Sequence, residues 1–478
     1  MSRRPPALLG LDLGSSSARA FVYDANGTPL AGHRTGYVWT ATQDGGLEID
    51  AESLVGFAVA AVDGLLADVR GRGIEIAAVG ISTFWHGLVG IDAELRPVTP
   101  AYSWGDTRAT AAAAALRQRV DGAALHARTG AFLHPSFPSV KLVWLRDAAP
   151  DAFAAARWWI SPGELVAARL CGILRHSMSM ASASGLFDQN ALDWDDEMLA
   201  LGGVSREQLL PVVPEPILAR GLAPEFRSRW PELDGIPWLA PAGDGACANV
   251  GSGCWDAASA ALSVGTTAAV RVVSAAPRVA IPRDLFCYRL DARRFVLGGA
   301  TSNGGNVWQW AREVLRLGRE EEIEAAIDAI DPASHGLVVE PFLAGERSPD
   351  WPLGARAAIA GISLATTPVE ILRAFMEGVA RRIASVRAHV REYAPDSAIV
   401  ASGRALAASP PFARIICDML GERLLLSDFG ETSSRGAALL AGEAIGALEI
   451  ERVPRLEGRI FEPDMRRNEF YRSVIPSV

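Results

Sequence analysis

Two segments about half a chain apart share one pattern, and this repeat constrains the fold more than any other feature. Residues 11–22 (LDLGSSSARAFV) align without a gap with residues 262–273 (LSVGTTAAVRVV). Each reads as a β-strand, a turn of glycine and hydroxyl residues, and a second β-strand. A single turn of this kind is more often an ordinary hairpin, but its duplication indicates two halves that are built alike.

The two turns also predict a chemistry. Backbone N–H groups and short hydroxyls in a glycine turn hold phosphate oxygens without the help of a lysine. The first turn holds the serines at 15–17, and the second holds Thr266 and Thr267. Asp12 precedes the first turn, where its carboxylate could hold a hydrated Mg²⁺ ion. We therefore expect one phosphate-binding turn from each half.

Between the repeats, the chain alternates helical and strand patterns. An amphipathic helix is predicted over residues 51–70 and a buried strand over residues 74–82 (IEIAAVGIS). This alternation is typical of an α/β layer around a mostly parallel sheet. Six prolines between residues 203 and 239 mark a loop-rich segment, and 478 residues suggest two to four domains. We predict domains at residues 1–240 and 241–445, and a tail at 446–478.

Several further elements follow from apolar periodicity. Helices are predicted over residues 153–170, 306–330 and 368–393. A strand over residues 398–402 leads into Gly403 and a helix, and such a corner is a weak signal for nucleotide binding.

Composition argues against several classes of protein. A formal net charge of −9 and a pI near 5.4 speak against a nucleic-acid-binding surface, which needs clustered cations. Five cysteines without a CxxC pair fit a reducing compartment, and no run of about 18 apolar residues exists to span a membrane. The start Met1–Arg4 resembles a leader, but Asp12 interrupts the apolar run and no cleavage site follows. These features predict a soluble, cytoplasmic protein.

The chain has a single lysine, Lys141. A Walker A loop needs Gly-Lys followed by Ser or Thr, so that architecture is excluded. If the protein handles ATP, it does so without a P-loop. Lys141 itself is either a surface charge or a contact for an anion, and the sequence leaves both readings open.

Four acidic or aromatic residues are candidates for contact with a small molecule. Asp244 lies in a turn between two glycines, so its carboxylate can approach a substrate closely. Trp85 and His86 follow the strand that ends at Ser82, where they would face a polyol or simply cover the sheet edge. Asp106 could bind substrate hydroxyls or pair internally with Arg108.

Taken in order, these pieces resemble the FGGY family of carbohydrate kinases, over roughly residues 7 to 445. The resemblance implies an α/β fold of two actin-like (ribonuclease H-like) ATPase domains with a cleft between them. Within the family, residues 129–145, 285–290 and 298–305 are most similar to bacterial gluconokinases. The motifs that carry the family resemblance are GLDLGSSSAR (10–19), WGDTRA (104–109), GDG (243–245), SVGTT (263–267), GGATSNGG (298–305), LAGERSPDW (343–351) and MEGVARR (376–382).

The resemblance implies ATP and Mg²⁺ as cofactors and a sugar or sugar acid as substrate. Asp244 would act as general base, taking a proton from a substrate hydroxyl as it attacks the γ-phosphorus. It further implies a nucleotide and metal site made of Asp12, Gly14, Ser15, Ser16, Ser17, Arg19, Gly265, Thr266, Gly305, Gln309 and Gly403, with Asp12 at the metal, and a sugar site made of Trp85, His86, Asp106, Ser136 and Asp244.

Three positions depart from the family pattern. Gly245 stands where relatives often have Gln or Asn, so one hydrogen bond to substrate would be missing. Trp85 stands where Met or a polar residue is common, which would narrow the pocket. Arg404 follows Gly403 where a second glycine is usual, and it would either stack on adenine or hinder its binding.

Gluconate, phosphorylated to 6-phosphogluconate, is the substrate that the resemblance favours, and a ketopentose such as xylulose or ribulose is the alternative. A sugar-binding regulator without catalysis and an actin-like ATPase that acts on proteins are the other classes. Homodimers are common in the family, but no stretch of this chain identifies an interface.

Overall fold

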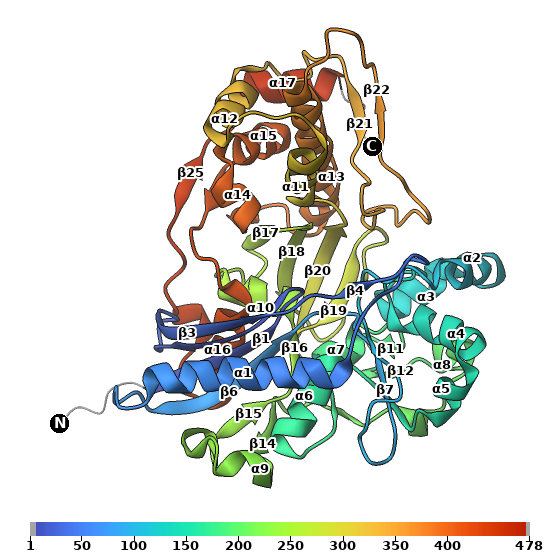
Figure 1. Ribbon diagram of the computed structural model, residues 1–478, viewed down its shortest axis with the longest axis vertical. Helices are drawn as coiled ribbons and strands as arrows, with labels where there is room; N and C mark the ends of the chain where they lie inside the picture. Colours follow the sequence, from blue (N-terminus) through green and yellow to red (C-terminus); the bar gives the residue numbers. More distant parts are fainter. Residues whose placement is uncertain (1–5, 475–478) are drawn as a thin grey trace.

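Two seven-stranded β-sheets organise residues 6–474, the part of the chain that the computed structural model describes (Figure 1). The start Met1–Arg4, rejected above as a leader, lies outside this range. The first sheet has the order β14-β15-β6-β1-β2-β3, and β16 also pairs with β6. Its strands are β1 (Ala7–Leu13), β2 (Ser17–Tyr23), β3 (Pro29–Gly36), β6 (Ile76–Thr83), β14 (Ile217–Arg220), β15 (Pro237–Leu239) and β16 (Ala242–Gly243).

The second sheet repeats the centre of the first. In the first sheet β1 pairs antiparallel with β2 and parallel with β6, and in the second β17 pairs antiparallel with β18 and parallel with β23. The predicted pair of like-built α/β halves is therefore confirmed. The order is β19-β20-β18-β17-β23-β24-β25, with β17 (Ser259–Val264), β18 (Ala268–Ala275), β19 (Phe286–Arg289), β20 (Arg294–Thr301), β23 (Ala398–Ser402), β24 (Leu424–Leu426) and β25 (Arg459–Phe461).

Helices cover both sheets. β1 is buried along its whole length, as expected for a strand with a layer on each face, and α1 and α6 pack on one side of this sheet (Figure 1). The helices of the first half are α1 (Ala51–Val69), α2 (Thr110–Arg119), α3 (Gly122–Thr129), α4 (Pro138–Ala148), α5 (Pro150–Ala155), α6 (Pro162–Cys171), α7 (Met178–Ser182), α8 (Asp196–Gly202) and α9 (Pro224–Arg227).

In the second half, the long α13 packs against α15 and against the second sheet (Figure 1). Its predicted range is confirmed, and a capping box at Thr367 fixes where it begins. The helices are α10 (Asp244–Gly251), α11 (Asn306–Val314), α12 (Glu320–Ala329), α13 (Pro368–Tyr393), α14 (Arg404–Ala408), α15 (Pro410–Leu420), α16 (Thr432–Ala444) and α17 (Met465–Val474).

Short ladders complete the architecture. One small sheet has three strands, β4 (Thr40–Ala41), β5 (Leu47–Ile49) and β8 (Ala101–Tyr102). The pairs are β7 (Val89–Ile91) with β9 (Trp158–Ile160), β10 (His176–Ser177) with β13 (Val212–Val213), β11 (Phe187–Asp188) with β12 (Asp193–Trp194), and β21 (Val338–Glu340) with β22 (Ala358–Ala360).

Two predicted elements need correction. The helix expected over 153–170 is broken into α5, β9 and α6, because Ser161 and Pro162 cap and begin a new helix. The helix expected over 306–330 is likewise two helices, α11 and α12. In the described part of the predicted tail, β25 adds a strand to the second sheet and α17 packs on α15.

Helix α16 joins the two halves. It lies in sequence between β24 and β25 of the second sheet, yet it packs on β1 and β6 of the first sheet and on α10 (Figure 1). Glycines make this close approach possible, since a Cβ atom on Gly80 would overlap the carbonyl oxygen of Ala437, and one on Gly436 that of Cys247. Neither β6 nor α16 can therefore carry a side chain at these contacts.

Gly80→Ala is expected to lower the free energy of unfolding by about 1–3 kcal/mol, because α16 must move away from β6. Gly56→Ala is the matched control, since Gly56 is an exposed glycine within α1 and no atom lies within 4 Å of its added Cβ. There the same change should be neutral or stabilise by about 0.5–1 kcal/mol. Denaturant unfolding of both variants measures the difference, and equal stabilities would contradict the proposed role of the contact.

None of the helices within residues 6–474 combines the length and apolar character needed to cross a membrane.

Candidate active site

The two glycine turns lie in one cleft. Gly14 donates its N–H to the Ser17 carbonyl at 3.0 Å, and Gly265 donates to the Thr267 carbonyl at 2.9 Å. In each turn the glycine N–H closes the loop, but the second turn is one residue shorter than the first. Ser15, Ser16, Gly265 and Thr266 are exposed and line a cavity of about 550 Å³ together with Asp244. The sequence repeat thus corresponds to two turns from opposite halves that meet at one site.

The remaining predicted residues of the first turn shape it rather than line the cavity. The Ser17 hydroxyl accepts a hydrogen bond from Arg19 Nε at 2.9 Å, and the Gly14 carbonyl accepts one from the Tyr37 hydroxyl. Arg19 also forms an ion pair with Asp12 at 3.3 Å. These residues fix the turn whose exposed tip is Ser15 and Ser16.

Asp244 lies at the carboxyl end of a strand, at the first position of α10. The short β16 before it pairs with β6, which places the carboxylate beside the end of the central strands. Its Oδ1 accepts N–H groups from Gly245 at 2.7 Å and Trp85 at 3.4 Å, while Oδ2 has no hydrogen bond among the described residues. One oxygen is therefore held by the backbone and the other is available to a ligand.

The electrostatic surroundings favour a protonatable carboxyl at this position. Burial raises the pKa of Asp244 above its ordinary value, the Arg271 guanidinium opposes that rise, and the Asp12 carboxylate adds to it. Arg271 is itself buried and is held by Asn249 and Ser263, each at 3.1 Å. A carboxylate of raised pKa in a cavity is suited to accept a proton.

Asp12 has the features of a ligand for a hydrated metal ion. It is 1% exposed, and its Oδ1 has no hydrogen-bond partner among the described residues. Burial raises its pKa, while Arg19 lowers it. No cluster of three metal-binding side chains occurs within residues 6–474, but Mg²⁺ usually takes only one or two carboxylates and completes its shell with water and phosphate. The site therefore fits Mg²⁺ bound together with a nucleotide.

Trp85 forms a wall of the cavity and fills space that a side chain at residue 245 would take. A Cβ on Gly245 would lie 2.5 Å from Trp85 Cζ3, and one on Gly243 would overlap the indole nitrogen. The indole packs edge-on against Tyr288, with ring centroids 5.1 Å apart, and donates to the Ser179 carbonyl at 3.2 Å. The tryptophan at 85 and the glycine at 245, the two departures from the family pattern noted above, are therefore linked, because the indole occupies the space of a side chain at residue 245.

His86 presents an acceptor to the cavity. It has φ +65° and its Nδ1 lies 2.8 Å from the Ala183 carbonyl oxygen, so Nδ1 carries the proton and Nε2 has a free lone pair. Burial lowers the pKa of His86 to about 3, which keeps the ring neutral. Nε2 can thus accept a substrate hydroxyl. Of the two readings left open above for Trp85 and His86, lining of the site is the one that the geometry supports.

The cavity lining includes two buried polar side chains, Arg347 and Tyr288, that were not identified as site residues from the sequence. Arg347 is 8% exposed, lies over the Trp104 ring at 4.5 Å and donates to the Thr301 carbonyl at 2.8 Å. It forms no ion pair with any described residue, and its Nε has no hydrogen-bond partner among them. The Tyr288 hydroxyl is likewise buried and unpartnered among the described groups. The signal for Arg347 was present in the motif at 343–351, but nothing local showed that its charge lacks a partner.

Asp106 is an internal ion-pair partner, the second of the two readings left open above. It is fully buried, pairs with Arg108 at 2.6 Å and accepts the Leu47 N–H at 3.1 Å. Arg108 in turn pairs with Glu48. Asp106 thus holds the β5 hairpin against the segment after β8, and it is not part of the cavity lining.

Ser136 lines a neighbouring cavity of about 1,000 Å³, on the other side of Trp104. Its hydroxyl lies 3.1 Å from His134 Nδ1, and its carbonyl accepts from Lys141 Nζ at 2.9 Å. Lys141 is fully buried and also donates to the Pro135 carbonyl at 2.6 Å, and burial lowers its pKa to about 7. Lys141 is therefore neither a surface charge nor an anion contact. Its hydrogen bonds to the carbonyls of Pro135 and Ser136 stabilise the conformation of this loop.

The predicted nucleotide corner borders the second turn. Gly403 lines the cavity with φ +117°, and a Cβ there would overlap the Val264 carbonyl oxygen. Gly305 donates to the Gly265 carbonyl at 2.7 Å, which joins α11 to the turn. Gln309 lies one helical turn later, where it is exposed, donates a hydrogen bond to Glu313 and does not line the cavity. Arg404 is exposed at the start of α14. Ser402, Gly430 and Ser433 also line the cavity and were not predicted.

Comparison with known proteins gives a consistent picture. Residues 7–251 match the N-terminal domain, and residues 260–445 the C-terminal domain, of the FGGY family of carbohydrate kinases. The gluconokinase of Bacillus subtilis (strain 168) is 27% identical over 460 residues, which cover 92% of this chain and 88% of that protein. The crystal structure of gluconate kinase from Lactobacillus acidophilus has 25% identity and a TM-score of 0.88, and covers 98% of this chain and 96% of its own. Ligand-bound xylulose kinase from the same organism matches with the same values.

Proposed function

Because the chain belongs to the FGGY family of carbohydrate kinases and is therefore an ATP-dependent phosphotransferase, we propose that its substrate is a sugar acid, with gluconate converted to 6-phosphogluconate. The proposal rests on the environment of Arg347, which is buried and has no ion pair among the described residues. A buried guanidinium without a carboxylate partner is costly unless the ligand provides a negative charge. Arg347 lines the same cavity as Asp244, so the carboxylate of an aldonate would pair with it at the end remote from the reacting hydroxyl.

The proposed mechanism places Asp244 at the reacting hydroxyl. Its Oδ2 takes the hydroxyl proton as the oxygen attacks the γ-phosphorus, while the N–H groups of Gly245 and Trp85 hold Oδ1 in place. Backbone N–H groups and hydroxyls of the turns at 14–16 and 265–267 would hold the phosphate oxygens in line with that attack. Mg²⁺, held near Asp12, would neutralise charge on the phosphates.

The rest of the pocket would recognise and enclose the sugar. The neutral His86 would accept a hydroxyl and the Tyr288 hydroxyl would donate to another, while Trp85 and Trp104 offer apolar faces to the carbon chain. Movement of the two halves toward each other would exclude water, which otherwise takes the phosphoryl group. Gly305, Gln309, Gly403 and the exposed Arg404 would border the adenosine.

A ketopentose is the second candidate substrate. It is favoured by the match to xylulose kinase, which is as close in fold as the match to gluconate kinase. A ketopentose is neutral and leaves Arg347 without a partner, so the two candidates make opposite predictions for this residue.

Arg347→Gln is expected to lower kcat/KM for gluconate by about 30- to 1,000-fold, the loss that follows removal of one partner of a desolvated charged pair. ADP release with Mg²⁺-ATP should be measured for wild type and variant with gluconate, xylulose, ribulose and glucitol, the neutral polyol of equal chain length. If gluconate does not stimulate the wild type, or if the variant loses activity equally on neutral sugars, the sugar-acid assignment is wrong.

A further inference from the structure

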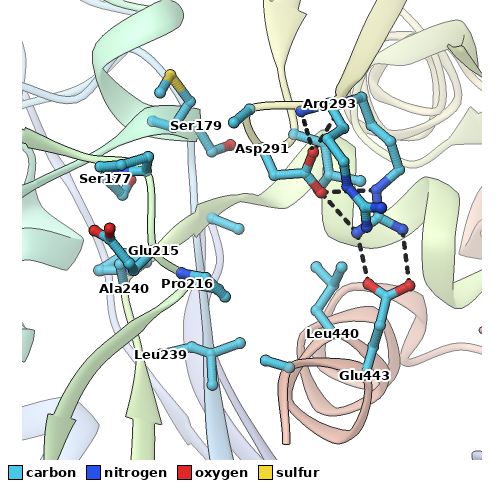
Figure 2. A pocket seen from close by; sticks show the side chains of 18 residues that line it. Ser177, Ser179, Glu215, Pro216, Leu239, Ala240, Asp291, Arg293, Leu440 and Glu443 are labelled. Carbon is cyan, nitrogen blue, oxygen red and sulfur yellow. Dashed lines mark hydrogen bonds and ion pairs between the residues drawn. The ribbon is translucent and has the colours of Figure 1, made fainter. Parts of the chain in front are cut away.

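A third cavity, of about 360 Å³, lies between the two halves and is separate from the cleft with Asp244. Its volume is within the range of ligand sites, about 300–1,000 Å³. Figure 2 shows its two walls facing each other, and we call it the inter-half pocket. One wall holds Ser177, Met178, Ser179, Pro214, Glu215, Pro216 and 239–242, and the other holds 290–294, Leu440, Glu443 and Ala444.

The lining of the pocket combines apolar side chains with hydroxyl groups that donate no hydrogen bond to a described residue. Leu239, Leu290 and Leu440 provide apolar surface from both halves. The hydroxyls of Ser177 and Ser179 each accept one backbone N–H at 3.0 Å, and neither donates a hydrogen bond to another described residue. Both serines are buried, so their protons are available only to an acceptor inside the pocket.

Within the part of the chain that the structure describes, one arginine of the lining has no ion pair. Arg294 is neutralised by Asp291 at 2.7 Å and by Glu443 at 2.6 Å; Figure 2 labels both carboxylates. Arg293, next to it, is exposed and forms no ion pair with any described residue. Glu215 on the opposite wall is equally exposed and also forms no ion pair with a described residue, so solvent screens both charges to the same degree and the lining holds one unpaired group of each sign. Unused donors and a free guanidinium favour a ligand with acceptor oxygens and a negative charge.

Ser179 connects this pocket to the active site. Its hydroxyl accepts from Gly243 N, the residue before Asp244, and its carbonyl accepts from Trp85 Nε1 at 3.2 Å. The segment 240–242, which forms part of the pocket wall, runs directly into Asp244. A ligand that moves α7 or this segment therefore moves the base and the Trp85 wall together.

We propose that the inter-half pocket is a regulatory site that binds a small carboxylate with an apolar body. The carboxylate pairs with Arg293 and accepts from the serine hydroxyls, while the apolar body packs between the halves against the three leucines. Because the walls come from both halves, occupancy biases their relative position and thereby the rate of phosphoryl transfer. The site is independent of which sugar is the substrate.

The probe is 3-phenylpropanoate, with the neutral 3-phenylpropanamide as the matched ligand. Isothermal calorimetry on the full chain should show that the carboxylate binds at least about tenfold more tightly than the amide. Arg293→Ser should weaken carboxylate binding at least about fivefold and leave the amide unchanged. Arg316→Ser removes an exposed, unpaired arginine elsewhere and should change neither. Ala444→Trp, which places a ring in the pocket, should abolish binding of both probes.

Kinetics provide the second readout, and calorimetry keeps it separate from the sugar assignment. At saturating probe, kcat/KM of the sugar-dependent reaction should change at least about twofold in wild type and not in Ala444→Trp. Absence of carboxylate binding, binding that is insensitive to both Arg293→Ser and Ala444→Trp, or binding without any change in kcat/KM would each overturn the proposed regulatory site.

Discussion

Asp244→Asn is expected to lower kcat by about 10²- to 10⁴-fold, the contribution of a positioned general base. Asparagine keeps the shape of the side chain, and its Oδ1 can still accept the N–H groups of Gly245 and Trp85. It cannot take the proton of the attacking hydroxyl. Nucleotide affinity, measured by calorimetry with ADP, should stay within about twofold of wild type. A variant that keeps a near-wild-type rate of ADP release would remove Asp244 from the role of base.

The same variant should be more stable than wild type. Burial raises the pKa of Asp244 in the folded chain above its unfolded value, so the folded state holds the proton more tightly. Stability from this group is therefore greatest at low pH and is lost as the pH rises through the folded pKa. At neutral pH the buried carboxylate of Asp244 is ionised and lowers the free energy of unfolding, whereas the neutral amide of the asparagine variant does not. We therefore expect Tm of the variant to be higher by an amount on the order of 2 °C at neutral pH. Asp396→Asn, at an exposed position without an ion pair, should change neither Tm nor kcat.

The raised pKa also sets the pH dependence of the wild type. Only the ionised carboxylate accepts a proton, so kcat/KM should fall as the pH drops through the pKa of Asp244. Because burial raises that pKa, the acid limb should lie at higher pH than for an ordinary aspartate. The residual activity of Asp244→Asn should lack this limb.

The repeated turns and the proposed base were accessible from the sequence because their signals are local. A glycine turn between two strands places its hydroxyls at an exposed tip wherever the strands pair, and the pairing itself follows from the apolar pattern. Asp244 could be recognised for the same reason, since its two glycine neighbours are adjacent in the chain. Family resemblance then supplied the roles of these residues.

What the sequence could not show depends on contacts between distant segments. Arg347 has Glu346 beside it in sequence, yet that carboxylate accepts N–H groups from Ser302 and from Arg347's own backbone and forms its ion pair with Arg382 at 3.6 Å. The Arg347 guanidinium therefore has no ion pair among the described residues. Helix α16 has an ordinary small-residue pattern, and only the fold shows that it lies on β1 and β6. The break at Pro162 was a local signal, but the apolar run on either side of it suggested one continuous helix.

Trp85 and Gly245 should show strong coupling in a double-mutant cycle. Gly245→Gln alone forces a side chain into the indole, whose Cζ3 lies 2.5 Å from the position of the added Cβ. We expect this variant to lose at least about 100-fold in kcat/KM, because the displaced indole lines the cavity beside Asp244. Trp85→Met alone leaves a void beside Tyr288 and removes the bond to Ser179, which should cost about 2–4 kcal/mol of stability.

The double variant should recover much of both losses, because the methionine side chain leaves room for the glutamine side chain at residue 245. A coupling free energy of at least about 1 kcal/mol, in Tm-derived stability and in kcat/KM, is expected from direct contact. Trp85→Met combined with Gly36→Ala is the control, since Gly36 is exposed on β3 with no atom within 4 Å of an added Cβ. That pair should be additive. If Trp85→Met and Gly245→Gln are also additive, the indole does not occupy the space of residue 245, and the narrow pocket needs another cause. If the two substitutions couple, the Trp85 indole occupies the space in which a polar side chain at residue 245 would contact the substrate. The double variant should then also phosphorylate neutral sugars on which the wild type is inactive.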